Sequence, residues 1–124
     1  MSHVSPEQIA SIAENYELMH GQISYSQLDC SHFVTSVLKT LDSHFGYMVA
    51  NDFPRSGKFR KVDRPERGDI IHWQHSPHGH VGIVLNPTSK EFIGSQSSTG
   101  VAKSHWGTGY WSHHGAITFL RYVG

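Results

Sequence analysis

The sequence predicts an α+β domain in which N-terminal helices pack on one face of an antiparallel β-sheet. Two amphipathic helical patterns come first, and short apolar segments separated by turn residues follow them. Helices that precede a run of hairpin-connected strands are typical of this class. The chain length suits one modest core, so residues 1–124 are expected to form a single domain.

The first helix is expected over about residues 6–19. Ser5 is a natural N-cap, Pro6 suits the first helical position, and Gln8 completes a capping box. Gly21 is expected to end the helix. Apolar residues that recur at helical spacing are expected to face the core, namely Ile9, Ile12, Ala13, Tyr16 and Met19.

The second helix is expected to begin near Asp29 and Cys30 and to run to about Ser43. Its apolar face consists of Phe33, Val34, Val37, Leu38 and Leu41. Cys30 lies four residues before Val34, so its side chain is expected on the core-facing side and not in open solvent.

The second half of the chain is expected to form the sheet. Residues 46–67 show no regular pattern and are locally basic, which indicates a solvated loop or a substrate-binding rim. Four strands are expected after them, at Asp69–Trp73, Gly79–Asn86, Glu91–Ser97 and Ala116–Val123. In the second strand, one face carries Val81, Ile83 and Leu85, and the other carries His80, Gly82 and Val84.

The composition excludes several function classes. There are 10 basic and 10 acidic residues, so no long-range field favours nucleic acid or an anionic membrane. No apolar run is long enough for membrane insertion, and the N-terminus lacks the pattern of a signal peptide. The protein is therefore expected to be made in the cytoplasm without a signal peptide. The single cysteine permits no intramolecular disulfide.

Cys30 is the candidate nucleophile. In the first turn of a helix, it would lie beside unpaired backbone N–H groups at the positive end of the helix dipole. Both effects favour the thiolate, and the same N–H groups can stabilise an oxyanion. Asp29 is expected to cap the helix, although its charge would oppose thiolate formation at close range. A buried structural cysteine is the alternative.

His80 is the candidate general base. It opens an apolar strand, from which an imidazole can project over the N-terminus of a packed helix and exchange a proton with a thiol. Gly82 follows it and leaves room for a closely approaching backbone or substrate. A polar residue at a strand edge, without catalytic function, is the alternative.

These segments together resemble the NlpC/P60 family of cell-wall cysteine peptidases. The resemblance rests on Asp-Cys-Ser-x-Phe-Val at 29–34, Gly-Asp-Ile-Ile at 68–71 and His-Val-Gly-Ile-Val-Leu at 80–85. It continues through residues 92–101 and Tyr110-Trp111, and it covers about residues 25–111. It implies a papain-like α+β core, Cys30 as nucleophile, His80 as general base, and no metal or organic cofactor.

The sequence departs from the family pattern at three places. His32 stands where the family usually has Gly, and it would narrow the cleft or add a polar contact. Gly94 stands where the family usually has a His that orients the catalytic imidazole. Gln96, two residues along the same strand face, is the proposed substitute, with Ser95 or a backbone carbonyl as alternatives.

The third departure concerns the tyrosine that the family has ahead of its cysteine. Tyr16 and Tyr25 are both candidates for a hydroxyl on the oxyanion side, and Tyr16 fits the core equally well. Together with Tyr25, the residues around the nucleophile are expected to bind substrate, namely Asp29, Ser31 and His32.

The resemblance implies hydrolysis of an amide bond in peptidoglycan stem peptides. A catalytic domain of this kind resembles secreted antibacterial effectors or toxins that act in the periplasm or cell wall of a target bacterium, and its producer would need an immunity protein as partner. The alternatives on the same scaffold are an acyltransferase, a peptidase acting on protein tails, and an inactive binding module.

A metal site is the competing interpretation of the histidines. His72, His75, His78 and His80 fall within nine residues, but their spacing fits no known zinc motif, and Asp69 is the only close carboxylate. No functional metal site is therefore expected. Outside this cluster, His105, His113 and His114 are expected at the surface or the cleft rim, Trp73 is expected in the core, and Trp106 and Trp111 fit a core or a groove.

Overall fold

The computed structural model describes residues 4–20 and 28–124. In these ranges the chain forms helices α1 (Pro6–His20) and α2 (Cys30–Leu41) and the short 3-10 helices η1 (Ala50–Arg55) and η2 (Gly109–Ser112). The strands are β1 (Phe59–Val62), β2 (Ile70–Gln74), β3 (His80–Asn86), β4 (Glu91–Gln96), β5 (Gly100–His105) and β6 (Ala116–Tyr122).

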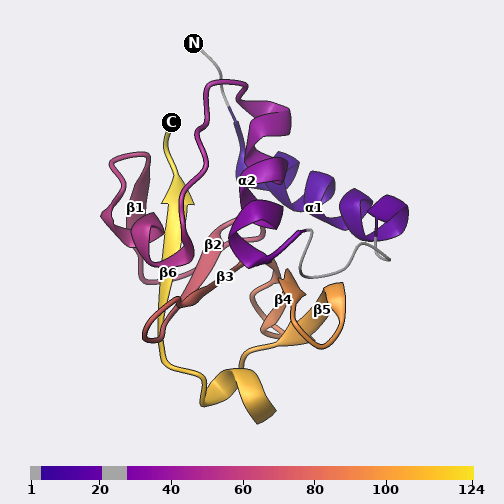
Figure 1. Cartoon of the computed structure of the whole chain (residues 1–124), viewed down its shortest axis with the longest axis vertical. Coiled ribbons are helices and arrows are strands. Elements are labelled where there is room, and N and C mark those ends of the chain that lie inside the picture. The colour runs from indigo at the N-terminus through magenta and orange to yellow at the C-terminus, as the bar shows by residue number, and fades with distance from the viewer. Residues whose placement is uncertain (1–3, 21–27) are drawn as a thin grey trace.

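The strands form one antiparallel sheet in the order β1-β6-β2-β3-β4-β5. The two helices pack against each other, and α2 packs on the neighbouring strands β3 and β4 (Figure 1). The predicted α+β class, with N-terminal helices on an antiparallel sheet, is therefore confirmed. This packing places the N-terminus of α2, where Cys30 lies, beside β3 and β4.

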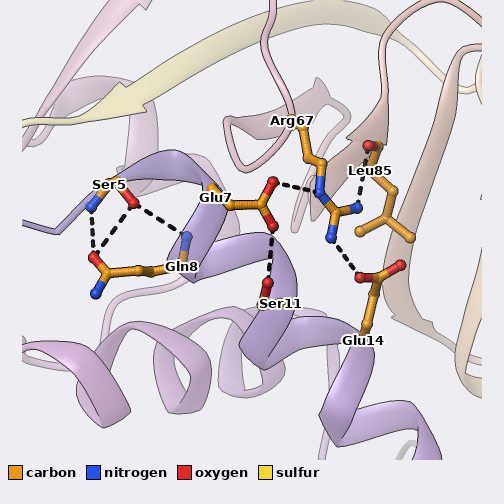
Figure 2. A network of polar contacts seen from close by, with 7 residues as sticks. All are labelled: Ser5, Glu7, Gln8, Ser11, Glu14, Arg67 and Leu85. Atoms are coloured by element: carbon orange, nitrogen blue, oxygen red, sulfur yellow. Dashed lines mark hydrogen bonds and ion pairs between the residues drawn. The ribbon is translucent and has the colours of Figure 1, made fainter.

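The start of α1 follows the predicted capping box. The backbone N–H of Ser5 donates to Gln8 Oε1 at 2.9 Å, and the backbone N–H of Gln8 donates to Ser5 Oγ at 3.3 Å. Figure 2 also shows Arg67, which pairs with Glu7 at 2.9 Å and with Glu14 at 2.5 Å. Arg67, one of the cations considered for a substrate rim, therefore fastens α1 to the segment before β2.

The sheet separates two apolar clusters. The larger cluster lies between the helices and one sheet face, and it includes Cys30 and the inward face of β3 at Val81 and Ile83. Because side chains alternate along a strand, the smaller cluster lies on the other face. Its buried members are Ile71, Trp73, Val84, Phe92 and Trp106, and Trp111 packs against them. The expected buried position of Trp73 is confirmed, since it is fully buried.

Several expectations about local structure are wrong. Residues 46–67 are not irregular throughout, because they contain η1 and β1, and β5 was not expected at all. β1 and β5 are edge strands with exposed charged residues, so they lack a clear apolar alternation. Met19 is 68% exposed and does not face the core, although Ile9 and Ala13 are buried as predicted. Gly21, the expected helix end, lies outside the described residues.

Candidate active site

Cys30 is the first residue of α2. The preceding residue, Asp29, is the N-cap, and its Oδ1 accepts the backbone N–H of His32 at 2.9 Å. The thiol-bearing residue is 5% exposed, on the core side that the helical spacing predicts. The Ser95 hydroxyl donates to the carbonyl oxygen of Leu28, which holds the start of α2 against β4. The position therefore gives Cys30 the helix-terminus environment that favours a thiolate.

A polar network surrounds the N-cap. Asp29 Oδ1 also lies 2.8 Å from His32 Nδ1 and accepts the Ser31 hydroxyl at 3.1 Å. Tyr47 completes the network, because its hydroxyl lies 2.9 Å from Ser31 Oγ and its ring stacks on His32 with centroids 4.1 Å apart. Partial burial opposes ionisation of Asp29, but the hydrogen bonds from His32 and Ser31 outweigh it and lower the pKa of its carboxyl.

Cys30 opens onto a cavity of about 340 Å³. Asp29 and Ser31 line the cavity on the helix side. Two other segments complete the lining, namely residues Tyr47, Val49, Ala50 and Asn51, and the turn residues Pro77, His78 and Gly79. Gly79 immediately precedes His80, so Cys30 shares this cavity with the turn that leads into the candidate base.

Asn51 is a residue of this cavity that sequence reasoning missed. Its Oδ1 lies 2.9 Å from His72 Nε2, and its amide nitrogen donates to the carbonyl oxygens of His75 at 3.3 Å and Pro77 at 3.4 Å. Gly79 has a φ of +69°, and a Cβ there would come within 2.0 Å of Asn51 Oδ1. Asn51 therefore fixes the turn that leads into His80, and no local sequence pattern indicates this contact.

His80 is the first residue of β3 and is 5% exposed. Its Nε2 is buried and has no hydrogen-bond partner among residues 4–20 and 28–124. Burial, with smaller contributions from His114 and His72, lowers the pKa of His80 to about 3. The imidazole is thus neutral at neutral pH, which is the protonation state of a general base.

Gln96 lies on β4, two residues after Gly94, which stands where the family usually has a third polar side chain. Its amide oxygen lies 2.9 Å from the point that a Cβ on Gly94 would occupy, so the Gln96 amide fills the space above Gly94. Its Nε2 donates to the carbonyl oxygen of Ala102 at 3.3 Å, and its Oε1 is buried without a partner in the described part of the chain. The structure therefore shows no Gln96–His80 hydrogen bond, although both groups have an unsatisfied atom.

The remaining expected site residues have mixed outcomes. Tyr25 lies outside the described residues. Tyr16 is half-buried and meets Phe33 edge-on with ring centroids 5.8 Å apart, which fits the core role. The Ser95 hydroxyl donates to the Leu28 carbonyl, so it is not the partner of His80 in this structure.

The described residues contain no group of three or more His, Cys, Asp or Glu side chains arranged to hold a metal ion. Asp69, the carboxylate nearest to the histidine cluster in sequence, is fully buried and accepts two hydrogen bonds from Arg121 at 2.9 and 2.8 Å. Likewise, no helix in the described ranges is long and apolar enough to cross a bilayer.

These features define an α+β protein with a cysteine at a helix N-terminus and a buried histidine at the start of a neighbouring strand. The model of the NlpC/P60 family matches residues 14–119. The chain belongs to the NlpC/P60 family, as the sequence resemblance predicted.

Solved structures agree with this assignment of the fold. The NlpC/p60 domain of the peptidoglycan hydrolase SagA superposes with a TM-score of 0.66 at 18% identity, over 94% of this chain and 98% of that one. An NlpC/P60 family protein from Bacillus cereus gives a TM-score of 0.70 at 19% identity, over the whole of this chain and 42% of that one. A comparison with curated protein sequences finds no match.

Proposed function

We propose that the protein is a cysteine peptidase or amidase that hydrolyses an amide bond in peptidoglycan stem peptides. The observation that carries the proposal is the placement of Cys30 at the start of α2, in a cavity whose wall leads directly into the buried, neutral His80. Membership of a family of cell-wall cysteine peptidases supports the reaction class, and the similarity to the SagA domain supports the substrate class.

The proposed reaction begins with proton transfer from the Cys30 thiol to His80. The thiolate then attacks the amide carbonyl carbon, and backbone N–H groups in the first turn of α2 would stabilise the negative oxygen. The C–N bond breaks as the imidazolium gives its proton to the leaving amine, and a thioester remains on Cys30. Water hydrolyses the thioester, with His80 accepting the proton of water and returning it to the thiolate.

Two further roles belong to the proposal. Gln96 Oε1 would accept a hydrogen bond from the His80 ring during the reaction, because hydrogen bonds of catalytic groups often form only in the substrate complex. Asp29 and Ser31 would contact the substrate from the helix side of the cavity, with the ionised carboxylate of Asp29 accepting hydrogen bonds from N–H groups of the substrate. His32 does not line the cavity and would contact the substrate beside Tyr47, on which its ring stacks. Tyr25 remains a candidate for the oxyanion side.

Mass spectrometry of digested peptidoglycan tests the proposal. Purified sacculi are incubated with wild-type protein and with Cys30→Ala, which is otherwise the same chain. Wild type is expected to release fragments that carry one added water and a new free amine, and Cys30→Ala is expected to release none. Absence of such fragments with wild type, or equal release by both proteins, contradicts the proposal.

Two observations favour a second candidate, an inactive binding module. The missing side chain at Gly94 and the unpartnered Nε2 of His80 leave the imidazole without the usual orienting hydrogen bond. Such a module would sediment with sacculi and release no fragment, and Cys30→Ala would bind as well as wild type.

We further propose that the substrate is reached in the periplasm or cell wall of a target bacterium, where the protein acts as an antibacterial effector and its producer carries an immunity protein. The basis is the location of peptidoglycan outside the cytoplasm. Export of the protein to the periplasm of a sensitive bacterium is expected to cause lysis, while the Cys30→Ala variant leaves growth normal. Normal growth with both proteins contradicts the effector role.

A further inference from the structure

The ring of His80 is covered by an aromatic side chain from a distant part of the chain. Trp111, in η2, stacks on the imidazole with ring centroids 4.4 Å apart and an angle of 23° between the planes. Trp73, from the neighbouring strand β2, approaches the same imidazole at 5.4 Å and 53°. His80 therefore contacts two indoles that also contact each other, and its contact with Trp111 is close to parallel.

Trp111 is itself held in place. The Trp73 indole N–H donates to the carbonyl oxygen of Trp111 at 2.8 Å, which fastens η2 to the sheet. The Trp111 ring also packs against Trp73 at 5.1 Å and meets Phe92 edge-on at 5.6 Å. A fixed indole can restrict its neighbour, whereas a mobile one cannot.

The imidazole needs such a restriction. The torsion that turns a histidine ring about its Cβ–Cγ bond has broad minima, so packing or hydrogen bonding must fix the plane of the ring. Here the Nε2 atom of His80 has no partner among the described residues, and the Gln96 amide nitrogen bonds to Ala102. The contacts of Trp111 and Trp73 therefore act on a ring whose Nε2 makes no hydrogen bond within the described residues.

We propose that Trp111 is a positioning residue, whose indole fixes the plane of the His80 imidazole for proton exchange with Cys30. This inference rests on the proposed function. Stacking sets the plane of the ring but does not choose which nitrogen faces the nucleophile, so a hydrogen-bond acceptor at the ring edge, such as Gln96, keeps a separate role. Trp111 thus takes over part of the orientation that Gly94 does not provide.

The matched control for Trp111 is Trp106. Both indoles belong to the smaller apolar cluster, and Trp106 packs on Phe119 at 5.4 Å instead of on His80. Trp106→Ala is therefore expected to lower the free energy of unfolding while kcat stays within about 2-fold of wild type. Trp111→Ala is expected to lower kcat about 10- to 100-fold with KM within about 3-fold, because small misplacements of a catalytic group have effects of this size.

Two further variants separate stacking from bulk. Trp111→Phe keeps a flat ring and is expected to recover kcat to within about 5-fold of wild type. Trp111→Leu fills apolar volume without a flat ring and replaces Trp111→Ala if that variant does not fold. The proposal is overturned if Trp111→Leu or Trp111→Ala retains wild-type kcat, or if Trp106→Ala loses as much kcat as they do.

NMR of the histidine ring provides a readout that does not depend on hydrolysis. The carbon-bound protons of His80 are expected to show upfield shifts from the stacked indole, kept in Trp111→Phe and lost in Trp111→Leu. Unshifted signals in the wild-type protein would overturn the proposal. If wild type shows the shifts and Trp111→Leu loses them, but wild type cleaves no peptidoglycan, the proposed function fails and the stacking of Trp111 on His80 is still established.

Discussion

The two halves of the candidate dyad are held by different interactions. Around Cys30, directional hydrogen bonds dominate. Asp29 Oδ1 accepts three of them, from the His32 amide, the Ser31 hydroxyl and the His32 ring. Around His80, ring packing dominates, with Trp111 and Trp73 against the imidazole and no hydrogen bond at Nε2 within the described residues.

This difference follows from the local sequence. A helix N-terminus leaves backbone N–H groups unsatisfied, so polar residues collect there. On β4, Gly94 offers no side chain, and the face of the sheet around it carries aromatic residues. The position of Cys30 is therefore expected to change when single hydrogen bonds are removed. The orientation of the His80 ring is expected to change when an aromatic neighbour is replaced by a side chain without a flat ring.

The largest expected effect comes from removing either reactive group. His80→Phe preserves an aromatic ring against the two tryptophans but cannot accept a proton, so it should fold while kcat for stem-peptide hydrolysis falls at least about 10³-fold. Cys30→Ser should lower kcat by a similar factor, because removing one residue of a catalytic unit costs about as much as removing the whole unit. Hydrolysis by His80→Phe above one tenth of the wild-type rate would exclude His80 as the base.

The acid stability of the protein should differ between the two regions. Burial lowers the pKa of His72 to about 4 and that of His80 to about 3, both below the ordinary value of 6.5. The unfolded chain therefore binds protons first, and stability falls as the pH drops from about 6.5 through 4 toward 3. The pKa of Asp29 is lowered below 3.8, so its contribution is lost only in stronger acid.

Urea unfolding between pH 7 and pH 4 measures this difference. The free energy of unfolding of wild type is expected to fall by roughly a few kcal/mol over this range. In His80→Phe, which removes one buried titrating group and keeps the ring contacts, the fall should be smaller. An identical pH dependence in both proteins would show that His80 is not buried in the neutral form.

Loss of the Gln96 amide should have an intermediate effect. Gln96→Leu keeps the volume above Gly94 and removes the acceptor, so kcat should fall about 10-fold, the equivalent of about 1.4 kcal/mol and of one hydrogen bond. Ser98→Ala is the control, because Ser98 and Gln96 line the same cavity of about 290 Å³. Equal kinetics of Gln96→Leu and wild type would leave ring packing as the sole orienting interaction at His80.

The smallest effect is expected on the helix side, from His32→Gly. This change gives the position its usual family residue and removes both the contact with Asp29 and the stack on Tyr47. Glycine near the helix start costs stability of about 1 kcal/mol or less. KM should change about 2- to 5-fold with kcat nearly constant, whereas a large loss of kcat would place His32 in the chemistry itself.

Local patterns in the sequence predicted the features that depend on near neighbours. The capping box of Ser5 and Gln8 follows from spacing at the start of α1, and the Asp29 cap and the core side of Cys30 follow from spacing in α2. The alternation of side chains along β3, which puts His80 and Val81 on opposite faces of the sheet, is equally local. These predictions needed no knowledge of distant contacts.

Features that depend on distant segments were not predictable in the same way. The turn before His80 is fixed by Asn51, and the ring of His80 is packed by Trp111. Gln96 was expected on the correct face, but its bond to Ala102 depends on the register of the β4–β5 hairpin, which was not anticipated. The sequence alone thus indicated the candidate dyad and left the contacts that hold its histidine unassigned.

The pH dependence of Cys30 alkylation tests the central claim most directly. Iodoacetamide modification of this single cysteine is followed by mass spectrometry from pH 4 to pH 10 in wild type and in His80→Phe. Because the neutral imidazole of wild type can accept the thiol proton, we predict faster alkylation of wild type than of His80→Phe at pH 7, with the two rates converging above the ordinary thiol pKa of about 8.5. Superimposable profiles for the two proteins would contradict a Cys30–His80 pair.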